Sequence, residues 1–406
     1  MKSITMIILI VQLLLFIFNI TPTISTSTWK PVTSINKVPG AIQGVYTVSS
    51  TSAFLAGGID GIGNGLFKLE GDNITQVMDI ETTSCKICMM TQVKMSSDGT
   101  KGLAGGVALL GFPVTYSTSD SGKTWQPSNV VAKGFNGAVS GHDIESLDGG
   151  IGNEWGFVSE FNSWANGTIC THGTISTQCS GVLVTKDGGK TYDNIDWHGT
   201  DGVDTDAMTG SFPTSKIWYI AGGLVQAESN PGPSFKSTIM KTMDGGETWR
   251  TVFNVSAPQN QPGKGVGGME DVACTTPDIC YAISACYDDD CYNYKKRYGS
   301  FVHKTIDGGK TWKELGFFYE QAMSKIVTIS NDELFIGGGG VGIFDDAVIW
   351  KSNDGGETFT NTTLKETGVL LDLSLMKDGK SGFATTVTSV TQSTTVWRFG
   401  DDNEVL

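Results

Sequence analysis

The chain has 406 residues, of which 17% are charged, and its formal net charge is −14. Phosphate backbones and anionic membranes would repel such a surface, so neither nucleic acid nor a membrane surface is an expected partner. Stretches of alternating Val, Ile, Thr, Tyr and Trp recur between Gly-rich turns, and no segment has sustained helical periodicity. The composition and patterning therefore predict an all-β protein.

The first residues predict a signal peptide. Lys2 is followed by an apolar run from Ile4 to Ile20, which gives way to small polar residues. The run is short for a membrane span, and the layout is typical of a secretory signal with cleavage after Ser25 or Ser27. We expect residues 1–25 to be removed and residues 26–406 to form one secreted, extracellular domain without stable membrane insertion. A retained signal anchor is the alternative.

Four N-glycosylation sequons follow the signal, and they are consistent with export. They lie at Asn73, Asn166, Asn254 and Asn361. Eight cysteines also follow the signal and fall as near neighbours. An even number in an exported chain indicates disulfides, and four His are too few to favour zinc sites. We expect neither metal nor cofactor. The expected disulfides are Cys85 with Cys88, Cys170 with Cys179, Cys274 with Cys280, and Cys286 with Cys291. Cys280 with Cys286, or Cys274 with Cys291, stays open because connectivity does not follow from sequence.

Five segments share the pattern Ser/Thr-x-Asp-x-Gly-x-Thr-aromatic. They are Thr118–Trp125, Thr185–Tyr192, Thr242–Trp249, Thr305–Trp312 and Ser352–Phe359. The Asp carboxylate can accept hydrogen bonds across the turn, the glycines supply the required backbone angles, and the aromatic ring packs between neighbouring elements. We therefore expect a structural role for Asp120 and Trp125, Asp187 and Tyr192, Asp244 and Trp249, Asp307 and Trp312, and Asp354 and Phe359.

This pattern resembles the Asp box, or BNR repeat, of sialidase-like, sortilin-like and Ycf48-like β-propellers. The boxes recur about every 50 to 70 residues, the length of a four-stranded blade with a variable loop. Two further units, Ala41–Gln76 and Gly368–Phe399, lack a box. The resemblance implies a single seven-bladed β-propeller of four-stranded antiparallel blades. Thr28–Val32 is similar to the tail of a box, so we expect this strand to close the ring, with Trp29 in the place of a box Trp.

Sialidases of this architecture use three convergent arginines and an Arg-Ile-Pro motif. This chain has only Arg250, Arg297 and Arg398, and it has no Arg-Ile-Pro. Sialidase activity is therefore not expected. We expect an extracellular binding module for carbohydrate or protein ligands rather than an enzyme. Neither the ligand nor the oligomeric state follows from the sequence.

Two features are candidates for a ligand face. Long connections in adjacent blades, opposite the boxes, span Phe161–Ser180, Leu224–Phe235 and Tyr287–Gly299, and they carry Trp164 and Tyr292. Loops pinned by disulfides lose little entropy on binding, although tolerated surface insertions are the alternative.

The second feature is a column on the innermost strands, obtained by aligning their starts. It contains Gly44, Gln92, Asp143, Asp206, Asp271, Lys325 and Asp372. Four carboxylates at the mouth of a channel would favour a cation, a basic ligand group or a raised carboxyl pKa. A hydrated polar channel is the plainer interpretation. A glycoside hydrolase that uses two of these carboxylates is the alternative function.

Overall fold

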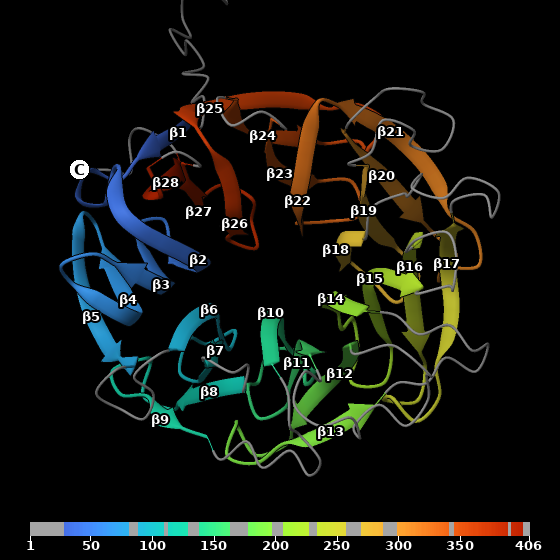
Figure 1. Ribbon diagram of the computed structural model, residues 1–406, viewed down its shortest axis with the longest axis horizontal. Helices are drawn as coiled ribbons and strands as arrows, with labels where there is room; N and C mark the ends of the chain where they lie inside the picture. The colour runs from blue at the N-terminus through green and yellow to red at the C-terminus, as the bar shows by residue number, and fades with distance from the viewer. Residues whose placement is uncertain are drawn as a thin grey trace, which may run out of the picture.

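The structure is a computed structural model of the chain. It describes residues 28–80, 88–108, 113–128, 138–162, 178–196, 206–226, 234–256, 269–286, 299–340, 345–388 and 391–400. These residues form a β-propeller of four-stranded antiparallel blades arranged in a ring (Figure 1), so the expected all-β class is confirmed. Among them, no helix is long and apolar enough to cross a membrane. The expected signal peptide lies outside the described residues.

Five blades are separate four-stranded sheets, and each runs in chain order from an inner strand to an outer one (Figure 1). The first two blades contain β6 (Cys88–Met95), β7 (Gly102–Ala108), β8 (Pro113–Thr118), β9 (Gln126–Pro127), β10 (Ala138–Ser146), β11 (Trp155–Asn162), β12 (Gln178–Thr185) and β13 (Asp193–Asp196). The next two contain β14 (Asp206–Ser211), β15 (Trp218–Gln226), β16 (Ser234–Thr242), β17 (Arg250–Ser256), β18 (Met269–Cys274), β19 (Cys280–Cys286), β20 (Gly299–Thr305) and β21 (Lys313–Tyr319). The fifth contains β22 (Gln321–Thr328), β23 (Leu334–Gly340), β24 (Asp346–Ser352) and β25 (Thr360–Thr367).

The remaining strands form one eight-stranded sheet that joins the two ends of the chain. It contains β1 (Thr28–Pro31), β2 (Val38–Ser49), β3 (Ser52–Ile59), β4 (Gly63–Glu70), β5 (Asn73–Asp79), β26 (Val369–Leu375), β27 (Gly382–Val387) and β28 (Ser393–Gly400). β1 pairs with the outer edge of β28, with Trp29 opposite Phe399, which is the pairing expected for the N-terminal strand. The start of β2 continues along the same edge, with Val38 opposite Thr394. A short 3-10 helix, Thr33–Ile35, links β1 to β2.

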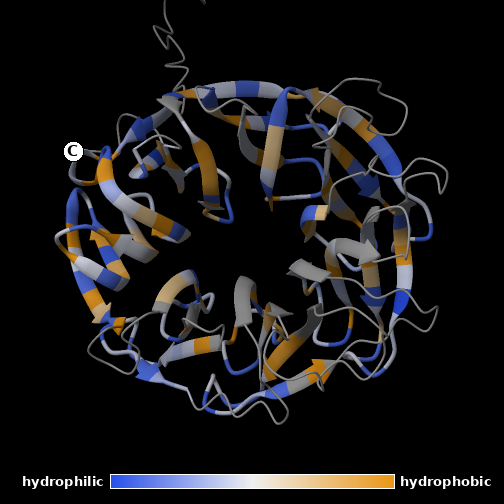
Figure 2. Ribbon diagram, viewed as in Figure 1, coloured by the Kyte–Doolittle hydropathy of each residue, from blue (hydrophilic) through white to orange (hydrophobic). Residues whose placement is uncertain are grey.

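Hydrophobic contacts are made mainly between consecutive blades. Figure 2 shows hydrophobic residues distributed over all the sheets rather than gathered at one centre. Between the β6–β9 and β10–β13 blades, for example, Leu103 packs with Trp155 and Phe157, and Trp155 is only 1% exposed. Burying one large side chain of this kind contributes about 2 to 3 kcal/mol. Each blade is therefore stabilised chiefly by its neighbours.

The five repeated turns connect the third and fourth strands of the separate blades. In one of them, Asp244 Oδ1 accepts hydrogen bonds from the Thr248 backbone N–H at 2.9 Å and from the Thr242 hydroxyl at 2.7 Å. Asp244 Oδ2 accepts the Thr248 hydroxyl at 2.5 Å. Gly245 and Gly246 have φ values of 81° and 96°, a region that strains any residue with a side chain. The bond from the Thr248 hydroxyl is the largest of the causes that lower the pKa of Asp244 to about 2.

The other four turns have the same pattern of side-chain contacts. The carboxylates of Asp120, Asp187, Asp307 and Asp354 each accept the backbone N–H and the hydroxyl of the Thr four residues later. The final aromatic residues differ in burial: Trp125, Tyr192 and Trp249 are buried, whereas Trp312 and Phe359 are half-buried. These contacts connect the third strand firmly to the fourth.

A sixth turn of this kind was missed from the sequence because it connects β10 to β11, the first two strands of a blade. Asp148 accepts hydrogen bonds from the Ser146 hydroxyl at 2.6 Å and from the Gly152 N–H at 3.0 Å. The Trp155 Nε1 donates to the Gly152 carbonyl at 3.1 Å, as Trp249 does to Gly246. The available signal was Ser-x-Asp-x-Gly followed by a Trp at a longer spacing than in the five repeats.

One of the expected disulfides lies among the described residues. Cys274 and Cys280 are bonded across the hairpin between β18 and β19, where they are direct cross-strand partners. The pairs Cys85 with Cys88, Cys170 with Cys179, and Cys286 with Cys291 lie outside the residues whose side chains are described.

Candidate functional site

The innermost strands share a β-bulge, which aligns them without reference to their starts. In every inner strand the register with the second strand of the same unit shifts by one residue. The residue after this shift occupies the same position in each inner strand, and these positions form the column. The column contains Gly44, Gln92, Asp143, Thr209, Asp271, Lys325 and Asp372. The expected place of Asp206 in this column is therefore wrong, because Asp206 pairs with Gly223 before the bulge and Thr209 takes the position.

Gly210 explains this error. In all six of the other inner strands the column residue is followed by Val, Ile or Leu, and Asp206 is likewise followed by apolar residues, Ala207 and Met208. The residue after Thr209 is Gly210, and a Cβ there would lie 2.7 Å from Ile220 Cδ1 and 2.8 Å from Val158 Cγ2. Side chains of neighbouring strands therefore fill the space that an apolar residue occupies in the other blades.

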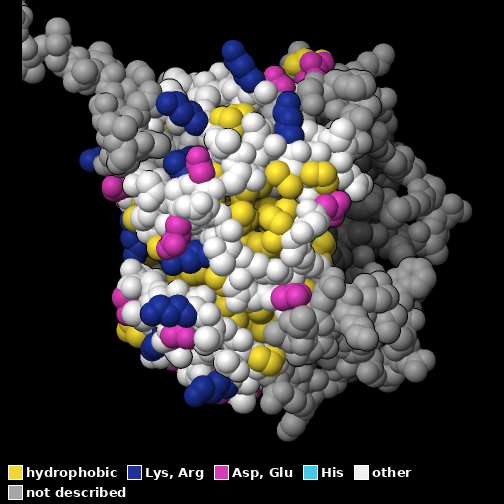
Figure 3. Space-filling model, turned by 90° about the vertical axis from the view of Figure 1, so that its left-hand side faces the viewer, with side chains coloured by type: hydrophobic (Ala, Val, Ile, Leu, Met, Phe, Trp, Pro, Cys, Tyr) yellow, Lys and Arg dark blue, Asp and Glu magenta, His cyan; other side chains and the backbone are white. Residues whose placement is uncertain are grey.

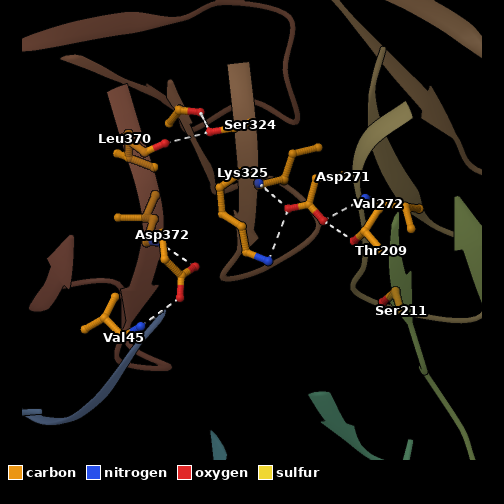
Figure 4. Close-up of polar contacts among 12 residues, drawn as sticks. Val45, Thr209, Ser211, Asp271, Val272, Ser324, Lys325, Leu370 and Asp372 are labelled. Atoms are coloured by element: carbon orange, nitrogen blue, oxygen red, sulfur yellow. Dashed lines mark hydrogen bonds and ion pairs between the residues drawn. The ribbon is translucent and has the colours of Figure 1, made fainter. Parts of the chain in front are cut away.

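Asp271 is held by two neighbouring blades (Figure 4). One carboxylate oxygen accepts the Thr209 hydroxyl at 2.6 Å and the Val272 N–H at 2.9 Å. The other accepts the Ile326 N–H at 2.8 Å and lies 3.6 Å from the Lys325 ammonium. Asp271 is 2% exposed, so its carboxylate is an internal connection between blades rather than a group facing solvent.

Asp372 repeats this arrangement where the two ends of the chain meet. Its carboxylate accepts the Val45 N–H from β2 at 2.8 Å and the Leu373 N–H from its own strand at 2.9 Å (Figure 4). Burial raises the pKa of Asp372, while the positive charge of Lys325 acts in the opposite direction. Asp372 is 3% exposed, so it too contributes to the join between adjacent inner strands.

A second row of contacts lies two residues further along the inner strands. Ser211 accepts the Cys274 N–H at 3.1 Å, Ser374 accepts the Thr47 N–H at 2.9 Å, and Glu145 accepts the Phe212 N–H at 3.1 Å. In each case a side chain of one blade satisfies a backbone N–H of the next. These polar side chains of the inner strands thus form hydrogen bonds between adjacent blades. The sequence pattern did not reveal this role.

The two described arginines lie on strands of different units. Arg250 lies on β17, whereas Arg398 lies on β28, where its guanidinium is 5.7 Å from the Phe383 ring centroid and donates to the Gly71 carbonyl. Arg297 lies outside the described residues. Arg398 is therefore engaged in joining two units of the eight-stranded sheet.

Several expected ligand-face residues cannot be placed on the structure. Trp164 and Tyr292 lie outside the described residues, and the side chains of Asp143 and Asp206 are likewise not described. The three long connections do join second and third strands of adjacent blades, namely β11 to β12, β15 to β16 and β19 to β20. In the described part of the chain, no group of three or more His, Cys, Asp or Glu residues is arranged to hold a metal ion.

No family model and no curated protein matches this sequence. Solved structures share its fold. A Ycf48 protein bound to a D1 peptide superposes with a TM-score of 0.55 over 93% of this chain and 95% of that one, at 12% identity. The WD40 β-propeller domain of Doa1 gives 0.53 over 94% and 99%, also at 12% identity. An ancestral GH74 enzyme gives 0.51 at 12% identity, over 91% of this chain but 47% of that one. The structural likeness establishes the β-propeller fold. At such low identity it shows the fold alone, and this fold is common to binding proteins and hydrolases.

Proposed function

We propose that the chain is a secreted, N-glycosylated Asp-box propeller that binds protein or carbohydrate ligands outside the cell. The engagement of its carboxylates carries this proposal. Asp271 and Asp372 accept backbone N–H groups from neighbouring blades and are almost completely buried. A general acid or base must reach the substrate directly or through one water. Two carboxylates occupied in this way favour a binding scaffold over the alternative glycoside hydrolase.

Seven blades is the count that best accommodates the eight-stranded sheet. Dividing it between β28 and β2 gives two four-stranded units, one of which is completed by β1. Hydrophobic clusters join each consecutive pair of units, including β26–β28 with β2–β4. The five repeated turns, with their Asp and Gly contacts, support the assignment to the Asp-box type.

The positions of the sequons support export and glycosylation. Asn73, Asn254 and Asn361 are exposed and lie on the outermost strands β5, β17 and β25. Asn166 lies outside the described residues. Glycans at these positions would cover the outer rim of the ring and leave its two faces accessible. We infer that the ligand binds on the face that carries the long second-to-third strand connections, which we call the loop face.

The first experiment uses the full secreted protein on a peptide array and a glycan array, with a hydrolase screen in parallel. We expect saturable binding without turnover, and enzymatic removal of N-glycans should increase gel mobility. The likeness to a peptide-bound Ycf48 protein makes peptides the first ligands to test. Hydrolysis that Asp271→Asn or Asp372→Asn abolishes at an unchanged melting temperature would instead establish the hydrolase. Absence of binding on both arrays would contradict the proposal.

A further inference from the structure

A cavity of about 370 Å³ opens at the loop face beside the hairpin between β3 and β4. Its walls are the start of β2, the hairpin itself and Met89 at the start of β6, so two consecutive units form it. We call it the hairpin pocket, and it is lined by Gly40, Ala41, Gly58, Ile59, Asp60, Gly61, Gly63, Asn64 and Met89. Its volume is in the range of small ligand sites and could hold one or two amino-acid residues.

The hairpin that forms the pocket is held in place by backbone contacts. Asp60 N–H donates to the Pro39 carbonyl at 2.9 Å, and Ile62 N–H donates to the Ile59 carbonyl at 3.1 Å. At the tip, Gly61 has a φ of 81°, and no atom of the described residues lies within 4 Å of the position that its Cβ would occupy. The backbone contacts hold the wall of the pocket, so little ordering is needed on binding.

The wall combines one carboxylate with the exposed apolar side chain of Met89, and Ile62 lies at the hairpin tip beside the lining. Asp60 is exposed and is the one charged residue among the described residues that line the pocket. Met89 is 38% exposed, and Ile62, at the hairpin tip, is 46% exposed. Figure 3 views the side of the ring that carries β4 and β5, and its described surface shows hydrophobic side chains near the middle and charged ones mainly on the left. Flexible Met side chains suit surfaces that adapt to a peptide.

We propose that the hairpin pocket binds an extended peptide segment in which Lys or Arg adjoins an apolar residue, a specification that rests on the proposed binding function. The cation pairs with the Asp60 carboxylate, and the apolar neighbour covers Met89. The negative net charge of −14 favours a cationic ligand in addition. The described lining contains no aromatic ring on which a sugar could stack, which favours a peptide over a carbohydrate.

The test follows the Met89 methyl signal by NMR in the full secreted protein, labelled with methyl-¹³C methionine and assigned with Met89→Leu. The probe is the dipeptide Ac-Leu-Lys-NHMe, compared with its norleucine analogue Ac-Leu-Nle-NHMe, which lacks the cation. We expect the Lys dipeptide to shift the Met89 signal saturably. Removing either the cation or, through Asp60→Asn, the carboxylate should weaken binding about two- to fivefold, as for a partly exposed ion pair.

Asp332→Asn is the matched control, because Asp332 is also an exposed carboxylate in a strand-to-strand turn but lies away from the pocket. It should leave the dipeptide affinity unchanged. A Met89 signal that no peptide shifts, or an affinity that Asp60→Asn leaves unchanged, would overturn the proposal. A signal shifted by methyl glycosides and not by peptides would also overturn it. If the protein binds ligands on the arrays while Met89 is unaffected, the pocket assignment fails and the proposed function stands.

Discussion

The ammonium of Lys241 on β16 lies 4.7 Å from the Tyr219 ring centroid, and it donates a 2.9 Å hydrogen bond to the Gly308 carbonyl in the repeated turn of the next blade. Lys241 and Tyr219 are direct cross-strand partners. The same pairing recurs with Lys304 over Tyr281, Lys351 over Phe335 and Arg398 over Phe383. Lys304 likewise reaches the Gly355 carbonyl of the following blade at 2.9 Å. An aromatic residue and a cation thus connect successive units through their turns.

This contact predicts the effect of Lys241→Met. The substitution keeps most of the apolar stem but removes the hydrogen bond to Gly308 and the attraction to the Tyr219 ring. Because the Gly308 carbonyl loses its partner, we expect a loss of about 1 to 3 kcal/mol in the free energy of unfolding, measured by urea denaturation. Lys313→Met is the control, since Lys313 forms an exposed ion pair with Glu357. It should cost less than about 1 kcal/mol. Equal effects of the two substitutions would contradict this assignment.

Asp244→Ala should destabilise the protein without abolishing ligand binding by the folded fraction. The Thr248 N–H and the hydroxyls of Thr242 and Thr248 lose their common acceptor. We expect a loss of about 1 to 3 kcal/mol, seen as a lower melting temperature. The pKa of about 2 in the folded state lies below the ordinary value of 3.8, so this stabilisation is present above pH 3.8 and is lost as the pH falls towards 2. Lost binding at unchanged stability would assign Asp244 to the ligand site instead.

Asp372 should tolerate an uncharged isostere better than truncation. Asp372→Ala leaves the Val45 and Leu373 N–H groups without their acceptor, and we expect it to cost about 2 to 3 kcal/mol. Asp372→Asn retains one acceptor and removes a buried charge, so its cost at neutral pH should be below about 1.5 kcal/mol. Burial raises the folded-state pKa, so the contribution of Asp372 is largest in acid and falls as the pH rises through that pKa. The stability advantage of the wild type over Asp372→Asn should therefore decrease with increasing pH. An advantage that increases would contradict the raised pKa.

His303 predicts a further pH effect, opposite in sign to that of Asp372 and the same in sign as that of Asp244. Its ring lies 3.0 Å from the Ser284 hydroxyl and 4.8 Å from the centroid of the Phe253 ring, and burial lowers the pKa of His303 to about 4. The unfolded chain binds a proton near pH 6.5, so stability is present above pH 6.5 and is lost as the pH falls towards 4. The loss should reach up to about 3 kcal/mol. His303→Phe, which fits the same aromatic surroundings but cannot titrate, should remove this part of the pH dependence. Identical pH profiles for wild type and variant would refute the assignment.

The all-β class and the order of strands could be predicted because their signals are local. Turn glycines, the spacing of the repeated turns and alternating strands are each visible within a few residues, as at Thr242–Trp249. The contacts between blades could not be predicted in the same way. The pairing of Lys241 with Gly308 joins residues 67 positions apart, and it depends on the placement of two adjacent sheets.

The candidate site was predicted less well for a related reason. Asp271 and Asp372 were correctly placed in one column, but that column depends on a bulge that aligned strand starts do not reveal. Their role also differs from a channel-mouth ligand site, because backbone N–H groups of the next inner strand occupy both carboxylates. One local signal for the contacts between blades is a Lys immediately before the Thr or Ser that begins a repeated turn, as in Lys241-Thr242 and Lys304-Thr305. This signal points to contacts between blades and gives no information on the ligand.

The last prediction concerns the strand that joins the two ends of the chain. Trp29 stacks on Phe399 at a centroid distance of 5.0 Å and packs against the cluster that contains Trp397, but it is half-buried rather than buried. Trp29→Ala should therefore cost about 1 to 3 kcal/mol of the free energy of unfolding. Trp125 is buried, so Trp125→Ala should cost more, about 3 to 5 kcal/mol.

Deleting residues 26–31 should be more severe than Trp29→Ala, because it also removes the strand that pairs with residues 397–400 and leaves the edge of β28 open. Thermal unfolding and aggregation on heating should both begin at lower temperature in the truncated protein. Lys123→Ala, an exposed substitution in the turn at Asp120, serves as the control and should leave the melting temperature unchanged. If the truncated protein melts at the wild-type temperature, β1 does not stabilise the ring. The division of the eight-stranded sheet into two blades, and with it the count of seven, would then have to be revised.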